Sequence, residues 1–325
     1  MPSQTINQEM KKRHVVPLLL TSHGYENEKQ SVYSLIENRY ETISHPVLEG
    51  KHILGSAYGW LVLTNINPLT DPDDCCLWNP ESNEKIQLPR LSQAWLYRRC
   101  FLSKPPTDPD CLVVFQNISV ESSVCRISDD EFVKVTHQPL EAMISSVQGE
   151  IYGIVQHGAY YELVTIHLIG KTVEFKSLLI NGKSHWVVPE LCRSWVTSHN
   201  YLIQSPGGSG EFFFVIKMAS RLSTYSDGNK EFRVFRLDVN GLVCVELENL
   251  DGHTIFIGSK GNEFCCLSTG MRVKPNSIYY TEIVGRVVFV YDLDDRSTTP
   301  LLPCPVAGRN QSVNYWVDLP YICLV

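Results

Sequence analysis

The sequence repeats one pattern six times along its length. Each unit contains an apolar run, a four-residue block, a tight polar turn and a second run of β-prone residues. The blocks are VYSL (Val32–Leu35), LWNP (Leu77–Pro80), CRIS (Cys125–Ser128), IHLI (Ile166–Ile169), FRLD (Phe235–Asp238) and VYDL (Val290–Leu293). Their second residues are separated by 45, 48, 41, 69 and 55 positions. A repeat of about 40–50 residues with several strands per unit is typical of a β-propeller.

The residue types within each unit favour strands joined by hairpins. Runs such as GWLVLTN (Gly59–Asn65) are rich in β-branched and aromatic residues, which pack well on a sheet surface. The joins Asp129-Asp130, Gly170-Lys171, Asn240-Gly241 and Asp294-Asp295 use residues that accept positive φ. The best helical candidate, LCRSWVTSHN (Leu191–Asn200), is short. We therefore predict an all-β protein with blades of about four antiparallel strands.

The predicted domain is a single propeller over residues 14–325, preceded by a disordered segment over residues 1–13. Six blades are expected, and the gap of 69 residues is interpreted as loop insertions at 206–212 and 218–232. A seventh blade within that gap is the alternative. Because an open sheet edge promotes aggregation, the chain ends should pair in one blade. The tail segment YWVDLP (Tyr315–Pro320) is expected to lie beside the N-terminal strand.

Composition excludes several classes of protein. A net charge of −7 argues against nucleic acid as the main partner. No apolar run approaches the roughly 18 residues that a membrane span needs, and MPSQTINQEM has neither a signal-peptide core nor an import sequence. A cytoplasmic or nuclear protein is therefore expected. The 11 cysteines include two vicinal pairs and no CxxC motif, which favours reduced, buried thiols over disulfides or a zinc site.

Local motifs do not indicate catalysis. The glycine-rich PGGSGE (Pro206–Glu211) lacks the lysine of a phosphate-binding loop, and NGKSHW (Asn181–Trp186) indicates a hairpin turn at Asn181-Gly182. The acidic pairs fall at turns, which explains them without chemistry. The histidines, including His167 in a predicted strand, have no metal-binding spacing. We expect no enzymatic activity, no cofactor and no metal.

One cluster combines aromatic and cationic residues in a predicted inter-strand loop. It consists of Trp95, Tyr97, Arg98 and Arg99, which follow LPRLSQ and precede a predicted strand. Aromatic side chains and arginine are enriched at protein interfaces. These four residues are the candidate partner-binding element, and packing under a neighbouring loop is the alternative.

The order of several segments resembles the plant KIB-type β-propeller family, also known as domain-of-unknown-function family 295, which is associated with F-box proteins. GSAYGWLVLTN and CCLWNPESNEKIQLP resemble its opening. LENLDGHTIFIGSKGNEFCC (Leu247–Cys266) and KPNSIYYTE (Lys274–Glu282) resemble its two most recognisable segments, in the family's order. The resemblance covers nearly the whole chain.

The resemblance implies a function in protein capture. Many such proteins resemble substrate receptors of Skp–Cullin–F-box ubiquitin ligases, in which an F-box of about 45 residues binds Skp; some engage a kinase in hormone signalling. Here the first blade is expected from about His14, which leaves no room for an F-box. Three hypotheses follow: a protein-interaction module without an F-box, with a kinase or other signalling protein as partner; a ligase receptor whose F-box is lost or missing from the gene model; and an enzyme or small-molecule sensor that uses the central channel.

Overall fold

The computed structural model describes most of the chain from residue 17 to residue 318. The described residues are 17–23, 29–35, 37–43, 45–65, 75–91, 97–117, 121–136, 144–147, 149–157, 160–170, 172–187, 195–206, 210–220, 230–258, 263–269, 273–282, 287–303 and 313–318. The predicted disordered segment 1–13 lies outside them, as does Trp95. The described residues form no helical segment with the length and apolarity that crossing a membrane requires.

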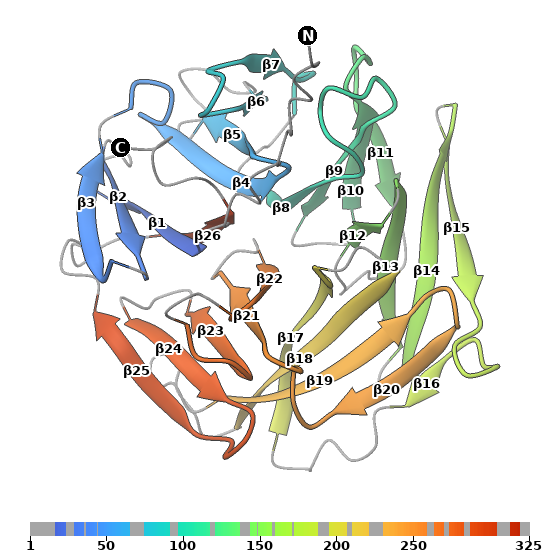
Figure 1. The fold of residues 1–325 in the computed structure, drawn as a ribbon. Helices are drawn as coiled ribbons and strands as arrows, with labels where there is room; N and C mark the ends of the chain where they lie inside the picture. The colour runs from blue at the N-terminus through green and yellow to red at the C-terminus, as the bar shows by residue number, and fades with distance from the viewer. Residues whose placement is uncertain are drawn as a thin grey trace, which may run out of the picture.

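The described chain forms 26 strands in six sheets, here called blades 1 to 6, with strands given from the axis outwards (Figure 1). Blade 1 contains β26 (Val313–Asp318), β1 (Pro17–His23), β2 (Lys29–Ser34) and β3 (Arg39–Ile43). Blade 2 contains β4 (Lys51–Ala57), β5 (Trp60–Asn65), β6 (Cys75–Trp78) and β7 (Lys85–Gln87). Blade 3 contains β8 (Tyr97–Leu102), β9 (Leu112–Asn117), β10 (Glu121–Arg126) and β11 (Val133–Thr136).

The second half of the ring is less regular. Blade 4 contains β12 (Ile144–Val147), β13 (Glu150–His157), β14 (Tyr160–Ile169) and β15 (Thr172–Leu178), and β16 (Trp186–Val187) also pairs with β14. Blade 5 contains β17 (Trp195–Gln204), β18 (Glu211–Ser220), β19 (Lys230–Asp238) and β20 (Val243–Leu247). Blade 6 contains β22 (Glu263–Leu267), β21 (His253–Ile257), β23 (Ser277–Thr281), β24 (Val287–Asp292) and β25 (Thr298–Pro303).

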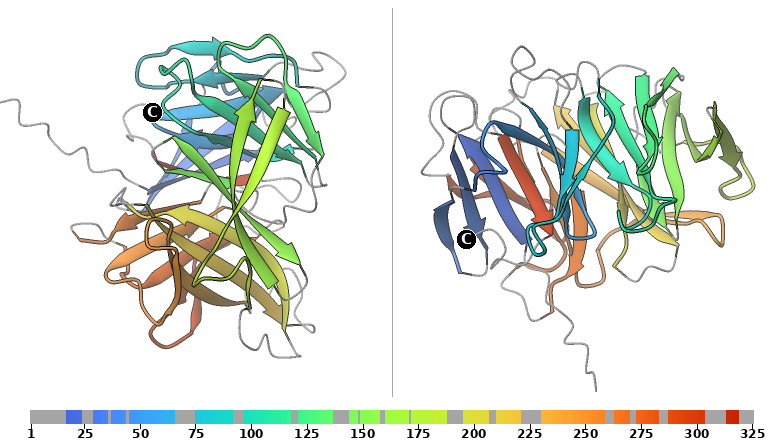
Figure 2. Two further views of the ribbon diagram at one scale, coloured as in Figure 1. Left: turned by 90° about the vertical axis from the view of Figure 1, so that its right-hand side faces the viewer. Right: turned by 90° about the horizontal axis from the view of Figure 1, so that it is seen from above.

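The six blades close into a ring around a central axis. Each innermost strand contacts the innermost strands of the two neighbouring blades, in the order β26, β4, β8, β12, β17, β22 and back to β26. Figure 2 shows the blades edge-on, with the β14–β15 hairpin at the outer edge of the ring. The protein is therefore a six-bladed β-propeller, as the repeat predicted, and the 69-residue gap holds no seventh blade among the described residues.

The two ends of the chain close the ring together. β26 pairs antiparallel with β1, with Trp316 opposite Leu19. The Trp316 side chain is fully buried and packs edge-on against Phe256 of blade 6 at a ring-centroid distance of 5.0 Å. The predicted pairing of the tail with the N-terminal strand is thus confirmed for Val313–Asp318.

The hydrophobic core consists of layers between neighbouring blades. Cys76 and Trp78 pack in the layer between blades 1 and 2, whereas Cys75 packs in the layer between blades 2 and 3. Cys265 and Cys266 also contribute to two different clusters. Successive strand residues point to opposite faces of a sheet, which is why each vicinal pair divides between two layers.

All six sequence blocks lie on the strand next to the outer edge of a blade, or at its end. In two blades the block's aromatic residue also fixes the following turn. Tyr33 Oη donates to Asn38 Oδ1 at 2.8 Å, and Trp78 Nε1 donates to Asn83 Oδ1 at 3.1 Å. Both asparagines have positive φ, +53° and +58°. In both blades the asparagine lies five residues after the aromatic residue, so this contact places the turn at the same distance after the block.

The hairpins at the predicted joins Asp129-Asp130, Asn240-Gly241 and Asp294-Asp295 are present, but these residues do not adopt positive φ themselves. Positive φ falls on Leu242 and Arg296, not on Asn240-Gly241 or Asp294-Asp295. In the first case the Asp238 carboxylate accepts the N–H groups of both Asn240 and Gly241, so an Asx turn uses these positions. The chain reaches the left-handed region one residue later. The hairpin turn at Asn181-Gly182 is confirmed, since both residues have positive φ.

Sequence patterns also misplaced parts of the region around blade 5. The insertion expected at 218–232 is partly strand, because β18 extends to Ser220 and β19 begins at Lys230. The short helical candidate at 191–200 contains the start of β17 from Trp195. Long paired strands thus account for much of the wide gap between the fourth and fifth blocks.

Candidate functional site at the propeller axis

Three of the four predicted partner-binding residues lie in a strand and not in a loop. Tyr97, Arg98 and Arg99 begin β8, the innermost strand of blade 3, and the pairing register shifts between Tyr97 and Arg99. The loop placement of these three residues is therefore wrong. Trp95 lies outside the described residues, as do the side chains of Tyr97 and Arg98. Arg99 is the member whose side chain the structure places.

Arg99 connects three blades at the axis. Its Nη1 lies 3.7 Å from Oε1 of Glu263, and its Cζ lies 5.2 Å from the ring centre of Tyr201. Glu263 begins β22 of blade 6, which lies across the ring from blade 3, and Tyr201 is in β17 of blade 5. Only 13% of the Arg99 side chain and 4% of the Glu263 side chain are exposed. The pair therefore spans the middle of the propeller in a largely dry environment.

Glu263 has an unusual environment for a carboxylate. Neither of its oxygens accepts a side-chain hydrogen bond in the described structure, and both are buried. Burial raises the pKa of Glu263, and the Arg99 guanidinium opposes this shift. Desolvation disfavours the charged form of a carboxyl group. Glu263 thus holds a proton more readily than an exposed glutamate does.

A second ion pair lies between blades 5 and 6. Lys217 Nζ in β18 is 2.8 Å from Oε1 of Glu282, which follows β23, and both side chains are about 5% exposed. Lys217 Nζ also lies 5.0 Å from the ring centre of Tyr280. Burial lowers the pKa of Lys217, whereas the Glu282 carboxylate raises it. The carboxylate is what allows a buried ammonium group to remain charged here.

Tyr201 links the two ion pairs electrostatically. Burial raises the pKa of its hydroxyl, Arg99 lowers it, and the carboxylates of Glu263 and Glu282 raise it further. Arg99, Tyr201, Lys217, Glu263 and Glu282 are called the axial charge cluster below. Its two cations and two carboxylates are matched in number, and each cation has a carboxylate partner. This arrangement can fix blades 3, 5 and 6 relative to one another.

The two segments that carry the family resemblance deliver both carboxylates of this cluster. β21 and β23 run parallel, with Ile257 opposite Tyr280, and β22 returns so that Glu263 is opposite Ile257. Glu263 and Glu282 therefore lie at the same end of blade 6. Sequence reasoning missed both, together with Tyr201 and Lys217. The sequence marked the two carboxylates only by their place in the segments that resemble the family: Glu263 lies within the first segment and Glu282 ends the second.

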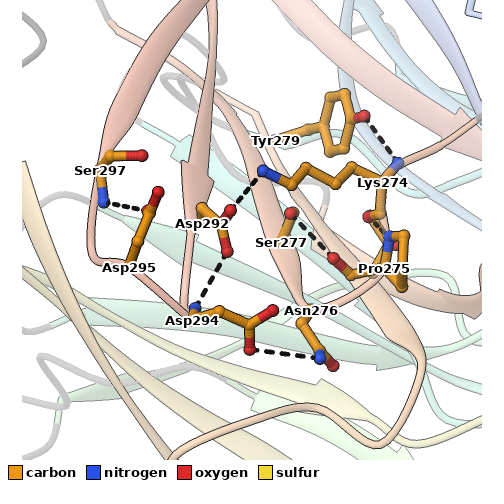
Figure 3. A network of polar contacts seen from close by, with 10 residues as sticks. Lys274, Pro275, Asn276, Ser277, Tyr279, Asp292, Asp294, Asp295 and Ser297 are labelled. Atoms are coloured by element: carbon orange, nitrogen blue, oxygen red, sulfur yellow. Dashed lines mark hydrogen bonds and ion pairs between the residues drawn. The ribbon is translucent and has the colours of Figure 1, made fainter.

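Polar contacts around Asn276 hold these two segments together (Figure 3). Asn276 has a φ of +53°, and its Oδ1 accepts the N–H groups of Leu250 and Gly252 at 3.1 and 3.3 Å. Its Nδ2 donates to Asp294 Oδ1 at 3.4 Å, in the turn that follows β24. One side chain thus connects the turn before β21 with the turn after β24.

Lys274 completes this network at the start of the second segment. Its Nζ forms an ion pair with Asp292, which raises the pKa of Lys274. Its backbone N–H donates to the hydroxyl of Tyr279 at 3.0 Å, and Asp292 Oδ1 accepts the N–H of Asp294 at 2.9 Å. The residues by which this segment resembles the family therefore stabilise blade 6, the blade that carries Glu282.

Other residue groups considered for chemistry have structural surroundings. The described residues contain no group of three or more His, Cys, Asp or Glu side chains that could hold a metal ion. Cys100, Cys111 and Cys125 pack in one core layer, where burial raises their thiol pKa values. Asp129 Oδ2 accepts the Arg126 N–H, and Asp295 Oδ1 accepts the Ser297 N–H, so these acidic residues stabilise turns.

Solved structures resemble the chain at low sequence identity. TolB from Acinetobacter baumannii matches with a TM-score of 0.47 and 11% identity over 93% of this chain and 66% of that chain. A chain of a nidogen/laminin complex gives 0.45 and 12% over 93% and 97%. The WD40 domain of SCAP from fission yeast gives 0.37 and 12% over 88% and 84%. No curated protein matches the chain.

The sequence profile of the KIB1-4 beta-propeller family matches residues 32–293. This range includes all six repeated blocks and both segments that build blade 6. It covers most of the chain, and the ring of six blades agrees with the architecture that the family description names. The chain belongs to the KIB1-4 beta-propeller family.

Proposed function

We propose that this propeller is a non-enzymatic module that captures another protein on the outer strands of blades 4 and 5. One observation carries the proposal. Within the described residues, eight large apolar or aromatic side chains are exposed, and six of them belong to these two blades. The six are Tyr160, Ile169, Phe175, Leu179, Val243 and Val245. Soluble proteins scatter such side chains singly, so six of them on the outer strands of two neighbouring blades favour these blades as the interaction surface.

The outer strands of these blades are also fixed relative to each other. The Asn181 N–H, in the turn after β15, donates to the Leu242 carbonyl at 2.8 Å. The Asn181 side-chain amide pairs with both the carbonyl and the N–H of Cys244 in β20. A surface that is rigid before binding loses less entropy when a partner docks.

The surroundings of the polar groups that could carry chemistry support a binding module rather than an enzyme. The cations of the axial charge cluster are paired with its carboxylates, and the acidic pairs at Asp129 and Asp295 stabilise turns. The buried carboxylate of Glu263 favours a second candidate, a small-molecule sensor at the axis. If that candidate is correct, Glu263→Gln will abolish ligand binding measured by calorimetry.

A finer proposal makes the captured protein a substrate of a Skp–Cullin–F-box ligase, with cytoplasm or nucleus as the compartment. It rests on the resemblance to plant F-box proteins and requires an F-box supplied by another polypeptide or by a longer form of this one. Recovery of Skp and Cullin with this chain from a plant extract would support it. Recovery of captured partners without them would contradict it.

The proposed function is tested by affinity capture with the intact chain as bait and quantitative mass spectrometry as readout. The double variant Ile169→Asp/Leu179→Asp places two charges on blade 4, where both side chains are more than half exposed. Leu267→Asp is the matched control, because Leu267 is 49% exposed but lies in blade 6. We expect specific partners to be lost with the double variant and retained with the control. Equal recovery with all three baits would overturn the proposal.

A further inference from the structure

A cleft of about 610 Å³ lies between the outer parts of blades 5 and 6. Its walls come from β19 and β20 on one side and from β24 and the following turn on the other. The volume lies within the range of about 300–1,000 Å³ that is usual for ligand sites. Nothing in the axial charge cluster contributes to it.

The floor of the cleft is aromatic and rigid. Phe232 and Tyr291 are 5% and 2% exposed, and their ring centroids are 5.1 Å apart. Both rings also pack within the layer between blades 5 and 6. Side chains that are locked by packing offer a preformed surface, so a bound group need not reorganise the site.

An apolar stripe leads out of the cleft along the edge strand β20. Leu247 lines the cleft and is half-buried, and Val245 and Val243 are 46% and 40% exposed. Alternate residues of a strand share one face of the sheet, so the three side chains form a continuous row. Their register partners on β19 include Val234, which also lines the cleft. An extended peptide lying along β20 would contact this row.

The rim of the cleft carries an excess of negative charge. Four carboxylates line it with only two guanidinium groups. Arg233 is engaged by Glu246, with Nε 2.6 Å from Oε1, and Arg296 lies 3.7 Å from Glu231 while 74% exposed. The remaining carboxylates, Glu248 and Asp294, are both exposed. Asp294 is held in position by the Asn276 amide (Figure 3).

We propose that this cleft binds an extended segment of a partner protein in which a lysine or arginine lies between apolar residues. The proposal rests on the proposed function and identifies the kind of partner that it captures. The cationic head of the segment contacts Glu248 and Asp294, its aliphatic stem covers the floor formed by Phe232 and Tyr291, and its apolar neighbours contact the row on β20. Acidic segments and nucleic-acid phosphates are repelled by the same rim.

The test uses fluorescence polarisation with the full chain and short capped peptides of alternating leucine and serine. Four peptides differ only in the central residue, which is lysine, arginine, glutamine or glutamate. We expect the lysine and arginine peptides to bind at least about tenfold more tightly than the glutamine peptide, and the glutamate peptide to bind most weakly. Raising salt from about 0.05 M to about 0.5 M should remove most of this preference.

The double variant Glu248→Arg/Asp294→Lys should invert the preference, so that the glutamate peptide binds most tightly. Glu49→Arg/Asp110→Lys is the matched control, because it makes the same change in net charge at exposed residues outside the cleft lining. The control should keep the original preference. No preference among the peptides, or the same inversion in the control, overturns the cleft proposal.

The two proposals fail in different ways. If the peptides show no preference but Ile169→Asp/Leu179→Asp still loses captured proteins, the cleft proposal is wrong and capture by blade 4 remains. If the peptides bind as expected and capture is unaffected by the blade 4 variant, the cleft is the capture surface and the blade 4 surface is not. If both experiments fail, neither proposal is correct.

Discussion

The axial charge cluster and the cleft between blades 5 and 6 contain the same kinds of side chain in opposite settings. In the axial charge cluster, Lys217 and Glu282 lie between blades 5 and 6, are about 5% exposed and are 2.8 Å apart. At the cleft, Arg296 is 74% exposed and lies 3.7 Å from Glu231. Buried ions must be paired to be tolerated, whereas exposed ions contribute little to stability and remain able to meet a partner. Charge at the axis thus stabilises the ring, and charge at the cleft is available for recognition.

The largest effect should follow from breaking the buried pair. Glu282→Gln leaves the Lys217 ammonium buried without its carboxylate, which should lower the free energy of unfolding by about 3–5 kcal/mol. Urea denaturation followed by tryptophan fluorescence measures this loss. Lys217→Met/Glu282→Leu removes both charges and should recover most of the stability. A change of less than about 1 kcal/mol in Glu282→Gln would mean that the pair does not stabilise the ring.

A close approach between two inner strands should give the next largest effect. A Cβ added to Gly55 in β4 would lie 2.4 Å from the backbone carbonyl oxygen of Cys100 in β8. Because that oxygen belongs to the backbone, blades 2 and 3 would have to separate, at a cost of about 1–3 kcal/mol. Thermal unfolding of Gly55→Ala measures this cost, with Ser56→Ala as the neighbouring control. Equal melting temperatures for both variants would show that β4 and β8 can separate without a measurable loss of stability.

Glu263→Gln should change the pH dependence of stability. Burial raises the pKa of Glu263 in the folded protein, so the folded state binds this proton more tightly than the unfolded chain does. The associated stability is complete below the unfolded pKa of about 4.3 and is lost as the pH rises through the folded pKa. Glutamine resembles the protonated carboxyl, so the variant should lose less stability over that range. Urea denaturation at a series of pH values tests this, and parallel profiles would contradict it.

The smallest effect on stability should come from the cleft. Glu248 and Asp294 are exposed, and Asp294 loses one long hydrogen bond from Asn276, so reversing their charge should change the free energy of unfolding by no more than about 1 kcal/mol. The same variant is the one expected to invert peptide preference. Urea denaturation of Glu248→Arg/Asp294→Lys checks the first expectation. A loss of more than about 2 kcal/mol would make the rim a structural feature and remove the contrast with the axis.

The sequence predicted the strands next to the outer edge far better than those at the axis. The six blocks succeed because these strands are paired on both sides and buried in two core layers, so their apolar pattern is strong. Inner strands such as β4 and β8 have a mixed composition, because their inner edge faces the axis. Their pairing with the next strand is also irregular, after Ile53 in β4 and after Tyr97 in β8. Period-two patterns are lost at such positions.

The axial charge cluster could not be assembled from local sequence. Arg99 attracted attention because of its aromatic and cationic neighbours, but its partners Glu263 and Tyr201 come from blades on other parts of the ring. The parallel pairing of β21 and β23 brings Glu263 and Glu282 to the same end of blade 6, and the repeat pattern predicts antiparallel strands only. The pairing of the two chain ends in blade 1 was predictable, because an open sheet edge promotes aggregation in any protein.

The most direct test of the contrast between axis and cleft is hydrogen–deuterium exchange of the full chain with and without saturating lysine-centred peptide. We predict slower exchange in β20, from Val243 to Leu247, and in the turn from Asp292 to Ser297, with no change in β8 and β22. Protection confined to the inner strands, or no protection in β20, would contradict the assignment of recognition to the cleft and of ring stability to the axis.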